Sequence, residues 1–304
     1  MPDPTALFVG AATWDVVADL PHLPAPDGRV VADDVVGAGG GPASTAAVAY
    51  ARLGLPARLA ATGGADREGA ALTGALDAAG VDTSLVRTVP GAASGSCVVL
   101  VDRSLDARAI CVRPGPQPQV DADDVLGVSL LHVDHLGLPA VQPHLARVPA
   151  GHRPVVSYDA GNLDPRRCPP WVDLYVPTLA ALAQLYGPGG TDALLDTALA
   201  DGATWVVATD GPRGAVAADR DGHYRIPAHD VAVRSTLGAG DVFHGALLAA
   251  YARGLPLPDA LAYANAAAAA SCRGLDGRSG IAGHEETVAL ARRLPATRTA
   301  TAPM

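Results

Sequence analysis

The strongest chemical signal in the sequence is a glycine-rich turn with a carboxylate, Gly238-Ala239-Gly240-Asp241, that leads straight into an apolar, helix-forming stretch. The two glycines leave the backbone free to present consecutive N–H groups to an anion at a helix start, and the helix dipole favours an ionised Asp241. Such amides can stabilise a moving phosphoryl group while the carboxylate accepts the proton of an alcohol. The four residues alone are equally compatible with a tight turn and a capping Asp.

This turn must be held by a larger framework, in which short apolar runs alternate with helix-like segments. The pattern predicts an α/β fold with a mainly parallel sheet covered on both faces, and ligands at the carboxyl ends of its strands. The predicted strands are Leu7–Gly10, Arg58–Ala61, Leu130–Val133, Val155–Tyr158, Leu174–Val176 and Trp205–Ala208. The predicted helices are Ala43–Leu53, Glu68–Ala79, Thr191–Ala200, Ala239–Arg253, Pro258–Cys272 and His284–Arg293.

Three partly polar segments interrupt this alternation and read as exposed strands: Val30–Val36, Ser96–Asp102 and Ala109–Arg113. They predict a small sheet that projects from the main body and acts as a lid. No linker-like change of composition separates the lid from the rest. We therefore expect one domain over residues 1–294, with lid strands within about 13–37 and 95–114, and a flexible tail over 295–304.

Composition limits the classes of partner. The 304 residues carry a formal charge of −9 and no cluster of Lys or Arg, which argues against nucleic-acid or anionic-membrane binding. The four cysteines form no CxxC pair, so neither a disulfide framework nor a metal-binding cysteine motif is expected. The N-terminus lacks a signal-peptide pattern, and no apolar run is long enough to span a membrane. These features predict a cytoplasmic protein.

The wider context of the glycine-rich turn resembles a known family. Residues 235–247, STLGAGDVFHGAL, are similar to the C-terminal signature of the ribokinase-like (PfkB-type) carbohydrate kinases. Residues 39–46, GGGPASTA, resemble the N-terminal signature, and residues 209–215, TDGPRGA, resemble the nucleotide-binding turn. Asn265 and its Ala-rich surroundings match the helix that borders the adenine. The four matches follow the family's order and span roughly residues 7 to 290.

The resemblance implies a three-layer α/β sandwich with a β-sheet lid, and a requirement for ATP and Mg²⁺. It also implies a homodimer formed through the lid. It assigns the catalytic base to Asp241, with Gly238, Ala239 and Gly240 as the anion hole. The acceptor sugar would contact Asp15, Gly39, Gly40, Gly41 and Ser44, and the nucleotide would contact Thr209, Gly211, Gly214 and Asn265. Taken alone, Asp15 and the three glycines also fit ordinary turns.

The chain departs from the family pattern at three places. Ser44 replaces a sugar-contacting Asn, and Thr178-Leu179-Ala180-Ala181 replaces the Asn-x-x-Glu motif that organises Mg²⁺ and phosphate. Ser235 replaces an Asp linked to a monovalent-cation site, so potassium activation is not expected. The Mg²⁺ ligands are therefore unknown from sequence. Asp159, at a strand end, is the one candidate, and it also fits an ordinary turn residue.

These departures resemble the sulfofructose kinase and ketohexokinase branch, whose members phosphorylate the C1 hydroxyl of a ketose. The segments GGGPASTAAVAYARLG and CRGLDGRSGI carry this likeness. Arg29 matches one basic residue of a sulfonate-binding cluster, His135 occupies another of its positions, and Arg113 could compensate for a missing member. Solvated side chains are the alternative interpretation for these three residues.

The resulting hypothesis is an ATP-dependent kinase that phosphorylates a hydroxyl of a ketose or a related small sugar. One alternative is a nucleoside kinase of the same fold, although the lid segments offer almost no aromatic surface for a base. The other is a non-catalytic sugar sensor, suggested by the missing Asn-x-x-Glu motif and opposed by the intact Gly238–Asp241 turn.

Overall fold

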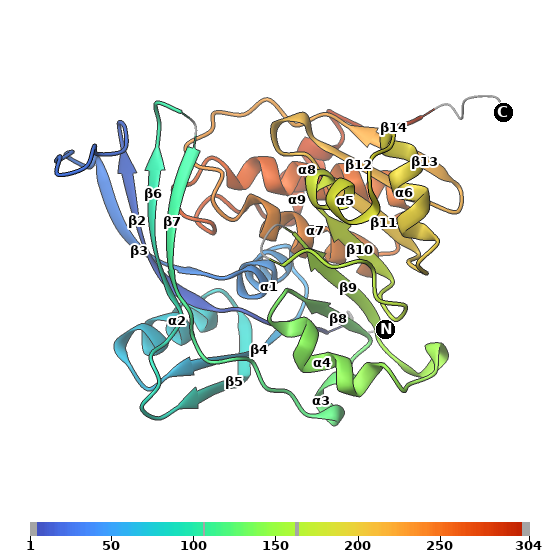
Figure 1. Cartoon of the computed structure of the whole chain (residues 1–304), viewed down its shortest axis with the longest axis horizontal. Coiled ribbons are helices and arrows are strands. Elements are labelled where there is room, and N and C mark those ends of the chain that lie inside the picture. Colours follow the sequence, from blue (N-terminus) through green and yellow to red (C-terminus); the bar gives the residue numbers. More distant parts are fainter. Residues whose placement is uncertain (1–4, 106, 162–163, 300–304) are drawn as a thin grey trace.

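A long, twisted sheet forms the centre of the molecule (Figure 1). The computed structural model describes residues 5–105, 107–161 and 164–299. Within them the strand order is β14-β13-β12-β11-β10-β9-β8-β1-β4-β5, parallel from β11 to β5 and antiparallel from β11 to β14. The strands are β1 (Ala6–Val9), β4 (Ala57–Gly64), β5 (Val81–Val89), β8 (Leu130–Val133), β9 (Val155–Ala160), β10 (Leu174–Pro177), β11 (Trp205–Thr209), β12 (Ala215–Asp219), β13 (Gly222–Ile226) and β14 (Thr297–Arg298).

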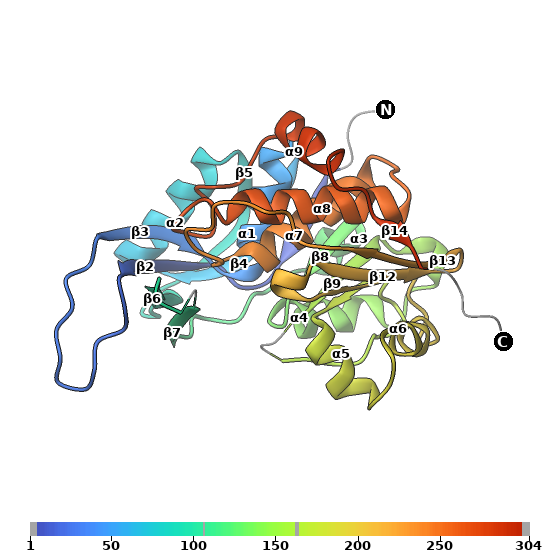
Figure 2. The ribbon, with the colours of Figure 1, turned by 90° about the horizontal axis from the view of Figure 1, so that it is seen from above.

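Helices cover both faces of this sheet (Figure 2). Residues Ala6 and Phe8 of β1 belong to the core on one face, whereas Leu7 and Val9 belong to the core on the other, because successive side chains of a strand point in opposite directions. The first core includes helices α1 (Pro42–Arg52), α2 (Arg67–Ala78), α7 (Ala239–Ala252), α8 (Leu257–Ser271) and α9 (His284–Ala291). The second includes α3 (Ala122–Leu126), α4 (Gly137–Leu145), α5 (Leu179–Tyr186) and α6 (Thr191–Leu199).

The sequence prediction of an α/β fold with a mainly parallel sheet is confirmed, and every predicted strand and helix of the main body is present. Strands β5, β12 and β13 were not predicted. The turn between β12 and β13 is short, and β13, at the antiparallel end of the sheet, alternates polar residues with the buried Tyr224 and Ile226. Strands β5 and β13 lack the continuous apolar runs that marked the central parallel strands, whereas the short apolar run Ala215–Ala218 of β12 was not recognised as a strand.

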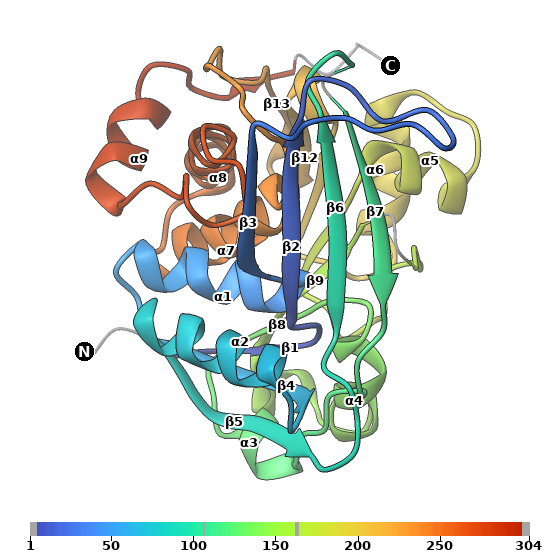
Figure 3. The same cartoon turned by 90° about the vertical axis from the view of Figure 1, so that its left-hand side faces the viewer.

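A second sheet of four strands projects from the body, as the sequence predicted (Figure 3). Its order is β3-β2-β6-β7, formed by β2 (Thr13–Leu20), β3 (Asp34–Gly40), β6 (Ser96–Asp102) and β7 (Ala107–Arg113). The prediction of a strand over Val30–Val36 was wrong in its limits, because β3 begins only at Asp34 and runs into the glycine turn. The inner face of this lid sheet places Val17 and Val99 against Leu237 and Leu275 of the body.

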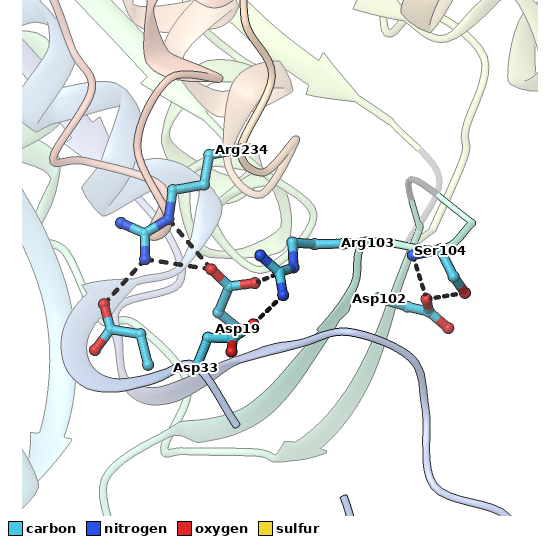
Figure 4. Close-up of polar contacts among 7 residues, drawn as sticks. Asp19, Asp33, Asp102, Arg103, Ser104 and Arg234 are labelled. Atoms are coloured by element: carbon cyan, nitrogen blue, oxygen red, sulfur yellow. Dashed lines mark hydrogen bonds and ion pairs between the residues drawn. The ribbon is translucent and has the colours of Figure 1, made fainter. Parts of the chain in front are cut away.

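Ion pairs fix the far end of the lid sheet to the body (Figure 4). Arg234 contacts Asp19 of β2 at 3.2 Å and Asp34 of β3 at 3.0 Å. Arg103 contacts the same Asp19 at 3.4 Å and also pairs with Asp33. Asp19 is almost completely buried, so its two arginines supply the compensation that a buried carboxylate needs. Since Arg234 lies four residues before Gly238, the lid is connected directly to the segment that enters the glycine-rich turn.

The expected flexible tail begins with a structured portion. Thr297 and Arg298 form β14, which pairs with Arg225 and Tyr224 of β13 at the edge of the main sheet. Residues 300–304 lie outside the described part of the chain. Across the residues that the structure describes, no helix combines the length and apolarity required to cross a bilayer.

Candidate active site

A cleft lies between the lid sheet and the N-terminus of α7, with an empty volume of about 310 Å³. It brings together three parts that are distant in sequence: Asp15 of the lid strand β2, the glycine turn before α1 and the glycine-rich turn before α7. Its lining consists of Asp15, Val17, Ala38, Gly39, Gly40, Gly41, Thr45, Leu237, Gly238, Asp241, Asp276 and Gly277. The sequence analysis singled out six of these residues for catalysis or sugar binding.

The turn before α7 has the backbone geometry of an anion site. Gly238 caps the helix with a left-handed φ of 71°, and a Cβ at this position would lie 2.8 Å from Cα of Gly277. The N–H of Ala239 is directed to the carbonyl of Thr236 at 3.4 Å. Within the described chain, the N–H groups of Gly240 and Asp241 have no acceptor, as expected in a first helical turn. The free donors therefore begin at Gly240 rather than at Ala239.

Gly240 differs from Gly238 in the space that surrounds its Cα. Its backbone is helical, and a Cβ added there would meet no atom within 4 Å. Neither the backbone conformation nor protein packing requires glycine at this position. A bare Cα beside free amides is what the close approach of a phosphate requires.

Asp241 faces the cleft from the first turn of α7. Burial, followed by the negative charge of Asp159, raises the pKa of Asp241 to about 7. In the free protein Asp241 is therefore only partly ionised at neutral pH, rather than fully ionised as the helix dipole alone predicts. Desolvation and a neighbouring carboxylate outweigh the dipole. A pKa near the working pH suits a residue that must accept a proton and later release it.

A histidine–aspartate pair lies close to Asp241. His244, one helical turn after Asp241, places Nε2 at 3.1 Å from Oδ1 of Asp159, the penultimate residue of strand β9. Burial alone would raise the pKa of Asp159, but His244 lowers it to about 2, and Asp159 in turn raises the pKa of His244. Asp159 is therefore the ionised carboxylate of the pair, and its charge contributes to the raised pKa of Asp241.

These charges predict a pH dependence. The base form of Asp241 disappears as the pH falls through about 7, so kcat/KM should decrease about tenfold per pH unit below that value. With an ordinary aspartate as the base, kcat/KM would begin to decrease only near pH 4. Because the phosphates of a nucleotide also titrate near pH 6 to 7, the ¹³C carboxyl resonance of Asp241 should be followed in the free protein. A midpoint near 4 would contradict the prediction.

The lid and the turn before α1 form the opposite wall of the cleft. Asp15 of β2 is 6 % exposed and accepts a hydrogen bond from the N–H of Cys97 at 2.9 Å. A Cβ on Gly40 would collide with the second carboxylate oxygen of Asp15, so the glycine makes room for this side chain. Gly41 has a φ of 91°, and a Cβ there would lie 2.6 Å from the carbonyl of Ala11. Burial raises the pKa of Asp15.

Ser44 does not take the place that the sequence suggested. Its side chain is fully buried, and its hydroxyl donates within the glycine turn, to Gly41 at 3.2 Å and also to Gly40. The same hydroxyl accepts from Nη2 of Arg278 at 2.7 Å. The structure thus corrects the assignment of Ser44 as a sugar contact, because its hydrogen-bonding capacity is used internally.

Two arginines near the cleft were missed by sequence reasoning. Arg278 reaches the turn before α1, and Arg108 of β7 donates to the hydroxyl of Thr236 at 2.7 Å, two residues before Gly238. Both contacts join segments more than 120 residues apart, so no local pattern could reveal them. The only available signal for Arg278 was its position within the CRGLDGRSGI segment.

The three residues proposed to bind an anionic substituent are not part of the cleft lining. Arg29 is exposed in the connection between β2 and β3. Arg113 donates to the carbonyl of Ser94 at 3.1 Å, and His135 lies in the turn between β8 and α4. The structure therefore does not bring Arg29, Arg113 and His135 together with Asp15 and Asp241.

The expected nucleotide residues lie at the carboxyl end of β11 and around one proline. Thr209 ends β11, and Gly211, with a φ of 55°, begins a short 3₁₀ turn. A Cβ on Gly214 would collide with the backbone next to Pro227, whose carbonyl accepts from Nδ2 of Asn265 at 3.0 Å. Gly214 and Asn265 thus contact the same segment. The Asn265 amide thus uses one of its N–H groups for a contact within the protein.

The site suits Mg²⁺ only as a companion of phosphate groups. Among the described residues, no cluster of three or more His, Cys, Asp or Glu side chains can hold a metal. Thr178 caps α5 by accepting from the N–H of Ala181 at 3.1 Å. Oδ1 of Asp159 is engaged by His244 and Gly161, which leaves Oδ2 as a free oxygen. One carboxylate oxygen together with phosphates and water is an ordinary Mg²⁺ environment.

The fold is an α/β fold with a projecting small sheet, and its cleft places the Asp241 carboxylate beside N–H groups that have no acceptor among the described residues. The sequence pattern of the pfkB family carbohydrate kinases matches residues 4–281 of this chain. The chain belongs to this family and is an ATP-dependent carbohydrate kinase.

Individual relatives agree with this assignment. An ATP-dependent ribose-1-phosphate kinase from Halopiger xanaduensis is 29% identical over 276 residues, covering 86% of this chain and 90% of the relative. A ribokinase structure from Thermotoga maritima superposes with a TM-score of 0.81 at 21% identity, covering 95% of this chain and 99% of that one. An Arabidopsis thaliana ribokinase with ribose and ATP gives 0.80 at 20% identity, covering 96% and 99%. These two structures show that the ribokinase-like fold is shared.

Proposed function

We propose that this enzyme transfers the γ-phosphoryl group of ATP to a primary hydroxyl of a small sugar in its furanose form. The observation that carries the proposal is the cleft that holds Asp15 and Asp241 together with the turns at Gly39–Gly41 and Gly238. One wall offers a carboxylate for sugar hydroxyls, and the other offers a base beside free amides. The small volume and the absence of aromatic residues from its lining disfavour a nucleoside acceptor.

In this mechanism the lid carboxylate Asp15 accepts hydrogen bonds from sugar hydroxyls and orients the acceptor. Asp241 takes the proton of the reacting hydroxyl, so that the oxygen can attack the γ-phosphorus as the bond to ADP breaks. The N–H groups of Gly240 and Asp241 stabilise the charge on the transferring group. Mg²⁺ would neutralise phosphate charge when bound, with Oδ2 of Asp159 as its candidate protein ligand. His244 holds Asp159 in place.

Two acceptor classes fit this proposal. The sequence motifs favour the C1 hydroxyl of a ketose, whereas the relatives described above carry ribose-type names. A ketose C1 and a pentose C5 are both primary hydroxyls beside a furanose ring, so one cleft can in principle align either. The ketose preference is supported by the sequence motifs alone.

An ATP-consumption assay with a panel of acceptors tests the proposal. The panel contains fructose-type and sulfonated ketoses, ribose, ribose 1-phosphate, sugar acids and nucleosides, each with and without Mg²⁺. Production of ADP that depends on a sugar, with a matching phosphosugar by mass spectrometry, is the expected result. Turnover only with nucleosides would overturn the acceptor class. Sugar binding without turnover would favour a sensor instead.

Asp15→Asn provides a separate prediction about the wall of the cleft formed by Asp15 and the turn at Gly39–Gly41, which we call the sugar wall. The change removes a charged acceptor for sugar hydroxyls, and a hydrogen bond to a charged group contributes about 1.5–3 kcal/mol. The KM for the sugar should therefore rise by roughly 10- to 100-fold, while the KM for ATP stays within about twofold. Steady-state kinetics with each substrate varied in turn measure both constants. An equal rise in both would instead indicate a general disturbance of the lid.

A further inference from the structure

Arg278 is an unusual buried cation at the edge of the cleft. Its side chain is 8 % exposed, although arginine is rarely buried unless it is paired. Its guanidinium donates to the carbonyl of Gly40 at 3.0 Å, to Oγ of Ser44 at 2.7 Å and to Oγ1 of Thr45 at 3.3 Å. All three acceptors belong to the turn before α1 or to the first turn of that helix, which form the sugar wall.

No carboxylate compensates this charge directly. Within the described chain, no carboxylate forms an ion pair with Arg278, and Asp15, Asp241 and Asp276 influence it only through longer-range electrostatics. Burial lowers the pKa of Arg278 to about 10, so the side chain still carries its charge at neutral pH. Burying a cation among neutral acceptors costs free energy that a hydrophobic side chain would not. Stability alone is therefore a poor reason for arginine here.

The segment that carries Arg278 also contacts the other functional parts. Leu275 packs against Val17 and Val99 on the inner face of the lid. Gly277 lies directly against Gly238. A Cβ added to Gly238 would lie only 2.8 Å from Cα of Gly277. Residues 275–278 thus contact the lid and the phosphoryl-transfer turn, and through Arg278 they contact the sugar wall.

Gly39 shows how closely the guanidinium fits this wall. The φ of Gly39 is not in the left-handed region, so backbone conformation does not require glycine there. A Cβ on Gly39, however, would collide with Nη1 of Arg278. Nη1 has no hydrogen-bond partner and is shielded from solvent. The glycine therefore accommodates the arginine, and the two residues form one packed unit.

We propose that Arg278 is a positioning residue that holds the sugar-binding turn in register with the Gly238–Asp241 turn. The inference rests on the proposed function. The planar guanidinium can make its three donor contacts at the same time, and these contacts attach Gly40 and the start of α1 to the segment 275–278. Gly277 of that segment packs against Gly238. The arginine thereby sets the position of the acceptor hydroxyl relative to Asp241. A displacement of about 1 Å between reacting groups can cost about 100-fold in rate.

The test compares Arg278→Met and Arg278→Lys with a matched control, Arg273→Met. Arg273 lies in the same connection but forms an exposed ion pair with Glu286 at 2.6 Å. Arg278→Met should lower kcat about 10- to 100-fold and raise the sugar KM, with the KM for ATP and nucleotide binding nearly unchanged. Arg278→Lys keeps the charge without the fork, so it should recover only part of kcat. Arg273→Met should behave as wild type.

Gly39→Ala perturbs the same contact from the other side and keeps the arginine. It should reproduce the loss of kcat, and its combination with Arg278→Met should be clearly less than additive. Additive effects would overturn the proposal, as would a folded Arg278→Met enzyme with normal kcat and sugar KM. A lower Tm with unchanged kinetics would indicate a purely structural arginine. A wild-type enzyme that phosphorylates none of the sugars would instead refute the proposed function.

Discussion

Asp241→Asn should reduce kcat by about 10²- to 10⁴-fold, the range expected when a positioned general base is removed. The side chain lines the cleft from the first turn of α7, beside two backbone N–H groups that have no acceptor among the described residues. Asparagine has nearly the same shape but cannot accept the hydroxyl proton. Sugar and ATP binding should therefore persist, and single-turnover kinetics should place the loss in the chemical step.

A change in folding cannot account for this result. Because the pKa of Asp241 is raised in the folded protein, its ionised form is disfavoured there, and the carboxylate reduces stability as the pH rises from about 4 toward 7. The asparagine variant should therefore have a Tm at pH 8 at least equal to that of wild type. Asp259→Asn is the matched control, since Asp259 occupies the first turn of α8 and is exposed. Near-normal turnover by the Asp241 variant would remove Asp241 as the base.

The sequence predicted the framework of the site because its signals are local. Gly39–Gly41 precedes one helix and Gly238–Gly240 begins another, and Asp15 follows the first strand, so that pattern and family likeness both point to them. The cleft then brings these segments together. The central parallel strands were also visible, because strands buried on both faces have continuous apolar sequences.

What the sequence could not reveal depends on contacts between distant segments. The raised pKa of Asp241 comes first from burial in the folded protein and then from the charge of Asp159 on another strand, and the helix-dipole argument included neither. Ser44 looked like a substitute for a sugar-binding side chain, yet its partner Arg278 is 234 residues away. The sequence shows which residue types are present, but it does not show which of them become spatial neighbours after folding.

Gly240→Ala should abolish most activity without destabilising the protein. The Cβ would enter open space, and alanine favours a helix by up to about 1 kcal/mol over glycine. The methyl group would, however, occupy the space that we assign to the phosphoryl group beside the free amides. Disturbing one such donor costs about 10²- to 10³-fold in kcat, so a loss of at least this size is expected. Nucleotide titrations, kcat and Tm together measure the effect.

Gly238→Ala separates the two reasons for glycine in this turn. At Gly238 the φ is 71°, and a Cβ would press against Gly277, so alanine should destabilise the fold by about 1–3 kcal/mol as well as lower activity. Gly240→Ala should show a wild-type or higher Tm with little turnover, whereas Gly238→Ala should lose both. If Gly240→Ala retained full activity, no phosphate could approach this Cα closely, and the anion site would have to lie elsewhere in the cleft.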